Sequence, residues 1–296
     1  MVGHPSRSAA ARAAPTAFRR MGLVGAPGHS ENARIRAEPR PRAGAHRTEG
    51  GLVKSLPAEV SPPALSRIGG LLYLVIIVIG IYVQTVVRGS VVVAGDPLAT
   101  AANLRASEGV WRAGIALDLF SCACTAVLAW ILYGLLRVVD RHLATLMLLL
   151  EGIAIATQVV FDLNMLVALF PLGRASYLSA FSAEQLATMA HLSARAQETG
   201  FGITLLFFGL LFPVRGYLIA RSGFMPSAIG VLVAVAGIGY VVNGFTMILA
   251  PGLARGLFLL VAPLILIGEG ALGLWLLVKG VSAEKWRVSA AREVTT

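Results

Sequence analysis

The chain has 296 residues, of which 56% are hydrophobic and 14% are charged, whereas an ordinary soluble domain carries about 25% charged residues. With a mean hydropathy of +0.76, the composition excludes a typical soluble domain and indicates a polytopic membrane protein. The formal net charge of +10 does not indicate nucleic-acid binding, because the basic residues lie in an N-terminal segment and beside apolar runs. Such a distribution suits membrane topology and anionic lipid head groups, so the expected partner is the lipid bilayer.

Residues 1–66 precede the first apolar run and form the first predicted region. They are rich in Ala, Arg, Pro and Gly and show no hydrophobic periodicity, so they cannot bury a core. We expect either a disordered basic tail or sequence translated from a start codon placed too early. An arginine-rich, acid-poor start also resembles an organellar transit peptide, but no amphipathic arginine face stands out from the composition.

Six apolar runs follow, and each is close to the ~20 residues that a helix needs to cross the hydrocarbon core. They cover residues 68–87, 113–136, 143–170, 200–220, 227–249 and 257–278. The expected fold is therefore all-α, a polytopic helical bundle with six transmembrane helices. We place this transmembrane domain at residues 67–280 and a polar, basic cytoplasmic tail at 281–296. An Asp-Pro pair in the first loop also predicts a short helix over residues 97–107.

The third apolar run carries Glu151, Gln158 and Asp162. At ~100° per residue, these three positions fall within ~40° of one another around a helix. An ionised carboxylate near the bilayer centre costs at least ~3 kcal/mol, so this polar stripe must face other helices. Asp118 lies on the preceding run, and the rise of ~1.5 Å per residue places Asp118 and Asp162 in the same half of the membrane. We expect these two carboxylates to share a cavity.

Two other runs contribute polar or small residues. In the fifth run, Gly230, Ala234 and Gly237 form a small-residue seam, which permits close approach of another helix. Asn243 is the polar residue in the outer half of that run, and Glu269 lies deep in the last run. The predicted polar interior therefore consists of Asp118, Glu151, Gln158, Asp162, Asn243 and Glu269.

The sequence predicts no metal site and no cofactor. Glu184, His191 and Glu198 recur every seven residues in the connection after the third run, where a capping-box sequence, SAEQ, predicts a peripheral helix. Successive members lie ~10 Å apart along such a helix, too far to share one ion, so we expect a solvated face. Cys122 and Cys124 are two residues apart and point to different sides of a helix, so they cannot pair with each other.

An even number of spans puts both termini on one side of the membrane. The basic residues near that side are Lys54, Arg67, Arg137, Arg141, Arg215, Arg221, Lys279, Lys285, Arg287 and Arg292. Those near the other side are Arg88, Arg105, Arg112, Arg174, Arg195 and Arg255. The positive-inside rule then predicts cytoplasmic termini.

Several spaced blocks of the sequence carry a family resemblance. They are the opening RIGGLLYLVIIVIGIYVQTVVRGSVVVAGDPLATAANLRASEGVWRAGIALDLF, the turn YGLLRVVDRHLATL, the block FFGLLFPVRGYLIARSGFMPSAIGVL and the ending LWLLVKG. Together they resemble the bacterial membrane protein family called domain of unknown function 4386, over about residues 67–280. The resemblance implies a six-helix integral protein of the bacterial inner membrane and implies no activity.

Three classes of function remain open from the residues. The buried carboxylates favour a small-solute or ion pathway, or a polar pocket for a small ligand. They are equally compatible with hydrogen bonds to Gln158, Asn164 or Asn243 that only hold helices together. A non-catalytic scaffold is the alternative suggested by the small-residue seam. A membrane-embedded enzyme is disfavoured, because no G-x-S-x-G, H-E-x-x-H or P-loop motif is present and no catalytic residue is predicted.

Overall fold

The computed structural model describes residues 61–293, without the side chains of Arg255 and Glu293. The predicted N-terminal region therefore lies almost entirely outside the described residues. Within them, six helical segments are long and apolar enough to cross a membrane, which confirms the predicted all-α, six-span fold. They are α1 (Pro62–Tyr82) continued by η1 (Val83–Arg88) and α2 (Gly89–Val91), then α4 (Glu108–Leu136), α5 (Arg141–Val167), α6 (Ala183–Arg221), α7 (Ser227–Leu249) and α8 (Pro251–Val278).

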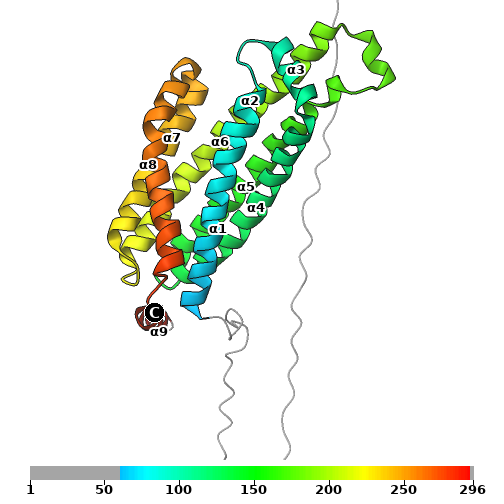
Figure 1. The fold of residues 1–296 in the computed structure, drawn as a ribbon. Helices are drawn as coiled ribbons and strands as arrows, with labels where there is room; N and C mark the ends of the chain where they lie inside the picture. The colour runs from blue at the N-terminus through cyan, green and yellow to red at the C-terminus, as the bar shows by residue number, and fades with distance from the viewer. Residues whose placement is uncertain (1–60, 294–296) are drawn as a thin grey trace, which may run out of the picture. The chain divides into compact units, whose positions relative to one another are not determined.

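Spans that are neighbours in the sequence are antiparallel in space (Figure 1), and short turns join α4 to α5, α6 to α7 and α7 to α8. Asp140 begins α5 by accepting a hydrogen bond from the Leu143 amide at 2.9 Å, as an N-cap aspartate does. At the turn between α6 and α7, Gly223 has a φ of 69°, a backbone conformation that glycine adopts without steric cost. The start of α1 and the end of α8 lie at the same end of the bundle (Figure 1).

The end of the bundle away from the termini carries the shorter elements. The predicted helix in the first loop is present as α3 (Pro97–Ala106), with Asp96 as its N-cap. Two 3₁₀ turns, η2 (Phe170–Leu172) and η3 (Ser176–Ala180), follow α5. They lead to α6, whose capping box of Ser182 and Gln185 is formed as predicted.

The peripheral helix and the fourth span, predicted as separate elements, are one helix. α6 has 39 residues and is ~58 Å long, well beyond the ~30 Å hydrocarbon core, so its first turns extend past the other spans. These turns pack against α3. Glu184 and Glu198 are exposed as predicted, but His191 is only 9% exposed. Its Nδ1 lies 3.1 Å from the Thr100 hydroxyl, so the prediction of a solvated face was wrong for this residue.

Thr100→Val is expected to lower the free energy of unfolding by about 1–3 kcal/mol, because it leaves buried polar partners without a hydrogen bond. The Thr100 hydroxyl accepts from the Val93 amide at 3.0 Å as well as meeting His191. The check is the thermal midpoint of the detergent-purified protein. Thr188→Val is the matched control, since that exposed hydroxyl bonds only to the Glu184 carbonyl within its own helix. Equal midpoints for the two variants would contradict the prediction.

The small-residue seam of α7 is used inside the bundle. A Cβ on Gly230 would lie 2.4 Å from the Gly216 carbonyl of α6, and a Cβ on Gly237 would lie 2.6 Å from Pro213 of the same helix. The backbones of α6 and α7 thus approach as closely as glycine allows. This intramolecular packing accounts for the seam, which leaves the scaffold alternative without its sequence support.

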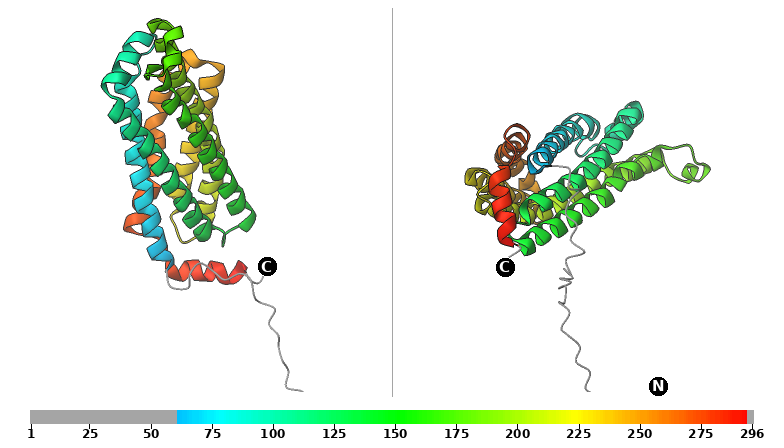
Figure 2. Two further views of the ribbon diagram at one scale, coloured as in Figure 1. Left: turned by 90° about the vertical axis from the view of Figure 1, so that its right-hand side faces the viewer. Right: turned by 90° about the horizontal axis from the view of Figure 1, so that it is seen from below.

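A helix not predicted from the sequence follows the last span. α9 (Ala283–Glu293) lies across the end of the bundle that carries the termini (Figure 2). Trp286 anchors it by donating its indole N–H to the Leu135 carbonyl at 3.0 Å. The predicted tail therefore includes a docked helix, as expected where an aromatic ring finds both an apolar surface and a hydrogen-bond acceptor.

Candidate functional site

The interior of the bundle contains a cavity of about 370 Å³. Residues from all six spans line it, and about half of them are apolar. The polar and charged members are Tyr73, Gln84, Thr85, Arg88, Asp118, Ser121, Cys122, Thr125, Glu151, Gln158, Arg215, Tyr240 and Glu269. Its volume is within the range of small-molecule sites in proteins. Four of the six residues predicted for the polar interior are therefore in contact with one cavity.

Arg88 organises the charged cluster nearer the loops that carry α3. Its guanidinium donates to Asp118 at 2.5 Å and lies 3.4 Å from Asp162. The residue ends the wide π-helical turn η1, and such turns are often found at functional sites. Within that turn the other terminal nitrogen of Arg88, Nη1, donates to the Gln84 side chain at 3.1 Å. Asp118 and Asp162 thus share one cation, but only Asp118 lines the cavity that the two were expected to share.

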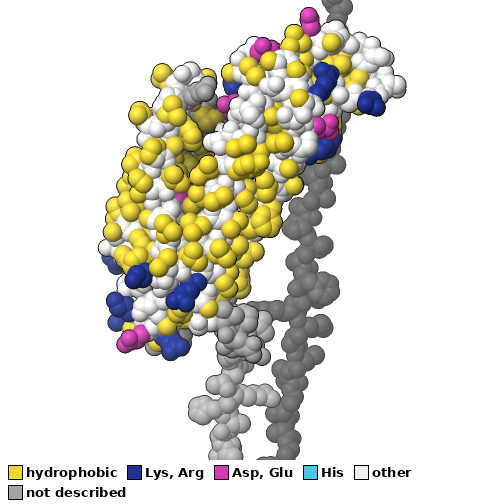
Figure 3. Space-filling model, viewed as in Figure 1, with side chains coloured by type: hydrophobic (Ala, Val, Ile, Leu, Met, Phe, Trp, Pro, Cys, Tyr) yellow, Lys and Arg dark blue, Asp and Glu magenta, His cyan; other side chains and the backbone are white. Residues whose placement is uncertain are grey.

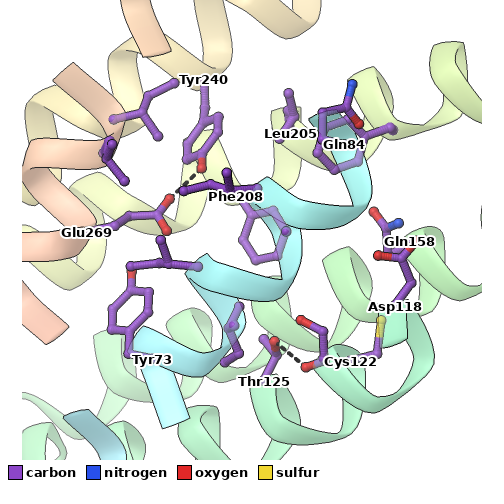
Figure 4. Close-up of a pocket in the computed structure, with 18 of the residues that line it drawn as sticks. Tyr73, Gln84, Asp118, Cys122, Thr125, Gln158, Leu205, Phe208, Tyr240 and Glu269 are labelled. Carbon is purple, nitrogen blue, oxygen red and sulfur yellow. Dashed lines mark hydrogen bonds between the residues drawn. The ribbon is translucent and has the colours of Figure 1, made fainter. Parts of the chain in front are cut away.

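Two amides hold the second carboxylate of this cluster. Gln158 donates to Asp162 at 2.8 Å from the preceding turn of α5, and Gln197 donates to the same oxygen at 3.1 Å from α6. Asp162 is 1% exposed, and its other oxygen has no hydrogen-bond partner among the described residues. It lies beside the cavity rather than among the residues that line it. Figure 4 shows Gln158, Asp118 and Gln84 gathered at this end of the cavity.

A second cluster lies nearer the termini and centres on Arg215. Its guanidinium is ion-paired with Glu151, and these side chains are 1% and 2% exposed. The Tyr73 hydroxyl lies 3.4 Å from the same guanidinium, whose carbon stands 5.1 Å above the Phe212 ring. A buried ion pair needs this kind of geometry, because both charges have lost their hydration.

Glu269 enters the cavity from α8. It accepts a hydrogen bond from the Tyr240 hydroxyl, and Figure 4 shows the two side chains pointing toward each other. No lysine or arginine in the described part of the chain forms an ion pair with it. Asn243, also predicted for the interior, is 1% exposed but is not a lining residue. Its amide donates to the Met247 sulfur at 3.8 Å.

The two arginines were not predicted as interior residues. Sequence reasoning counted Arg88 and Arg215 as topology charges at the ends of spans, whereas both are ion-paired inside the bundle. The carboxylates predicted for the interior could have indicated these arginines, since buried acids need buried cations. When Arg88 and Arg215 are left out of the count of flanking basic residues, each side of the membrane loses one. The excess on the side of the termini is therefore unchanged.

The arrangement puts three carboxylates and two guanidinium groups around one cavity, with a fourth carboxylate, Asp162, beside it. Along α5, Glu151 and Asp162 are eleven positions apart, or ~16 Å of helix rise. The two clusters are therefore separated by about half of the ~30 Å hydrocarbon thickness. Each cluster has one arginine and two carboxylates in or beside it. Such a surface is suited to a cation or a proton more than to an anion.

The possible metal ligands of the described residues are not grouped into a metal site. Within residues 61–293, no group of three or more His, Cys, Asp or Glu side chains is placed to hold a metal ion. Cys122 and Cys124 are free thiols. Cys122 lines the cavity beside Asp118, whereas Cys124 does not.

Six apolar spans surrounding a cavity with internal ion pairs define a multi-pass membrane protein of the helical-bundle class. Residues 68–280 match the family described as Domain of unknown function (DUF4386), and the chain belongs to this family. The match confirms the resemblance seen in the sequence blocks. No curated protein and no solved structure was found to match the chain.

Proposed function

We propose that the protein provides a pathway for a small, positively charged solute or ion across the bacterial inner membrane, with both termini in the cytoplasm. The observation that carries the proposal is the single cavity that contacts both charged clusters. Intramembrane ionisable residues are costly, and in membrane proteins they mark substrate, ion or proton routes. The excess of carboxylates over guanidinium groups supports a cationic cargo.

Among the carboxylates of the cavity, Glu269 is favoured as the group that meets the cargo, because it has no ion-pair partner in the described part of the chain. Glu151 is neutralised by Arg215, and Asp118 and Asp162 share Arg88. Glu269 has a tyrosine hydroxyl as its partner instead. A cation near Glu269 therefore gains attraction without displacing an existing ion pair.

The test is transient current recorded from proteoliposomes on a solid-supported membrane after jumps in pH, Na⁺, K⁺ or an organic cation. The wild-type protein is expected to give a current for at least one of these, and Glu269→Gln is expected to reduce it at least ten-fold. Glutamine keeps an acceptor for Tyr240 and removes only the charge.

Glu198→Gln is the control for that experiment, because Glu198 is exposed and pairs with Arg195 on the surface of α6. It is expected to retain the wild-type current. A wild-type protein that gives no current for any of these ions, or a Glu269→Gln variant with full current, would contradict the proposed pathway.

A further inference from the structure

The wall of the cavity next to Glu269 is aromatic. Tyr240, whose hydroxyl bonds to Glu269, packs against Phe212 with ring centroids 5.4 Å apart and against Phe208 at 6.4 Å. Figure 4 shows Phe208 and Tyr240 on the side of the cavity where Glu269 lies. Aromatic faces attract cations, and this attraction is larger in a site removed from water. A carboxylate and an aromatic wall together favour a cation that also has an apolar body.

Ionisable groups on four other helices line the cavity around Glu269. They are Tyr73 on α1, Glu151 on α5, Arg215 on α6 and Tyr240 on α7. Arg215 is occupied by its ion pair with Glu151. Arg215 and Glu151 neutralise each other and the two tyrosines are uncharged, so an ionised Glu269 is balanced by a bound molecule with one positive charge.

The cavity has a mouth between the outer halves of α1 and α8. In their inner halves these helices touch, since a Cβ on Gly70 would lie 2.3 Å from the Leu277 amide nitrogen. Further out, Ile81 and Leu266 both line the cavity and are 49% and 48% exposed. Gly80 also lines it, and a side chain there would meet no atom within 4 Å. In Figure 3 the surface is hollowed where the outer ends of α7 and α8 stand apart from the rest.

In a bilayer this mouth would open toward lipid. Its rim is mainly apolar, with Thr85 as an exposed polar member, and it lies on the sides of two helices that are long and apolar enough to cross a membrane. A hydrophilic ion gains nothing from approaching through hydrocarbon, whereas a compound with an apolar body partitions there readily. The position of the mouth therefore selects for an amphipathic ligand.

We propose that the cavity binds a monovalent organic cation with an apolar, ring-bearing body, which enters from the bilayer between α1 and α8 and places its charge against Glu269. The inference rests on the proposed function for its reading of the cavity as a ligand site, and it adds the ligand class, the charge partner and the entrance. The cavity of about 370 Å³ suits a compound with one or two rings.

The probe is 1-methyl-4-phenylpyridinium, and binding to the protein in lipid nanodiscs is measured by equilibrium dialysis. Biphenyl-4-carboxylate, a probe of similar shape and opposite charge, is measured in parallel. We expect saturable binding of the cation, at least ten-fold weaker binding to Glu269→Gln, and no binding of the anion. Glu198→Gln is the matched control and is expected to bind as the wild type does.

A second measurement uses the unaltered protein, so it does not depend on the folding of a variant. Dicyclohexylcarbodiimide reacts with carboxyl groups in apolar surroundings, and mass spectrometry identifies the modified residue. We expect labelling of Glu269 that 1-methyl-4-phenylpyridinium suppresses and biphenyl-4-carboxylate does not. Labelling that the cation leaves unchanged would overturn the assignment of Glu269.

The entrance is tested by Gly80→Trp, which fills the open space at the rim. It is expected to slow association of the cation at least ten-fold. Gly152→Trp is its control, because a side chain on this exposed α5 glycine likewise meets no atom within 4 Å and Gly152 is not a lining residue. Equal association rates for the two variants would overturn lateral entry.

Different results would overturn the organic-cation site and the proposed pathway. Equal cation binding by wild type and Glu269→Gln, or preference for the anion, overturns the organic-cation site. Currents driven by protons or metal cations would still support a pathway in that case. Saturable, Glu269-dependent binding without any current would support the site and overturn the pathway.

Discussion

Arg215→Met is expected to lower the free energy of unfolding by about 3–5 kcal/mol, because it leaves Glu151 as a buried charge without its cation. Both side chains are almost completely buried and meet in a direct ion pair. The measurement is the unfolding midpoint of the detergent-purified protein in heat or in a series of sodium dodecyl sulfate fractions. The loss is expected to appear as a clear fall in the midpoint and a smaller folded fraction after purification.

The double variant Arg215→Met, Glu151→Leu provides the decisive control. Replacing both partners of a buried pair by apolar residues is often neutral or stabilising, so this variant is expected to recover most of the lost stability. Arg195→Met serves as the surface control, because its pair with Glu198 is half exposed and such pairs contribute about 1 kcal/mol or less. If Arg215→Met melts no lower than Arg195→Met, the interior ion pair does not have the role inferred for it.

The second large effect is expected from Gly216→Val at the crossing of α6 and α7. A Cβ there would lie 2.4 Å from the Gly230 carbonyl oxygen and 2.9 Å from the Ala234 Cβ, so two backbones must separate. Overpacking typically costs about 1–3 kcal/mol, and a contact with backbone is at the upper end of that range or beyond it. The same unfolding midpoint measures the change.

Gly152→Val on the open face of α5 is the control for this substitution, since a side chain there meets nothing within 4 Å. It is expected to leave the midpoint near the wild-type value. A Gly216→Val variant as stable as Gly152→Val would show that α6 and α7 do not approach so closely. The comparison separates the steric effect from the general effect of valine in a helix.

The number and positions of the spans could be predicted because the bilayer fixes the length of an apolar helix. The predicted run at 227–249 coincides with α7. Helical periodicity also placed Asp118, Glu151 and Gln158 toward the interior, where they line the cavity. A charge inside an apolar run carries its own positional constraint, since it cannot face lipid.

The continuity of α6 was missed because hydropathy marks where a helix meets lipid, not where it begins. Its polar first half, from Ala183 onward, lies against α3 instead of the bilayer core. His191 is buried there through a hydrogen bond with Thr100, a residue 91 positions earlier in the chain. No local pattern contains that contact.

The sequence by itself determined that this is a six-span helical membrane protein of its family with carboxylates in its interior, because those properties follow from run length, periodicity and the cost of charge in lipid. Only the tertiary structure decided which cations meet those carboxylates. An arginine near the end of an apolar run has the same local signature whether it reaches the membrane surface or turns inward. Arg88 and Arg215 turn inward because Asp118 and Glu151 stand on helices that fold beside them, and that left Glu269 with Tyr240 as its partner.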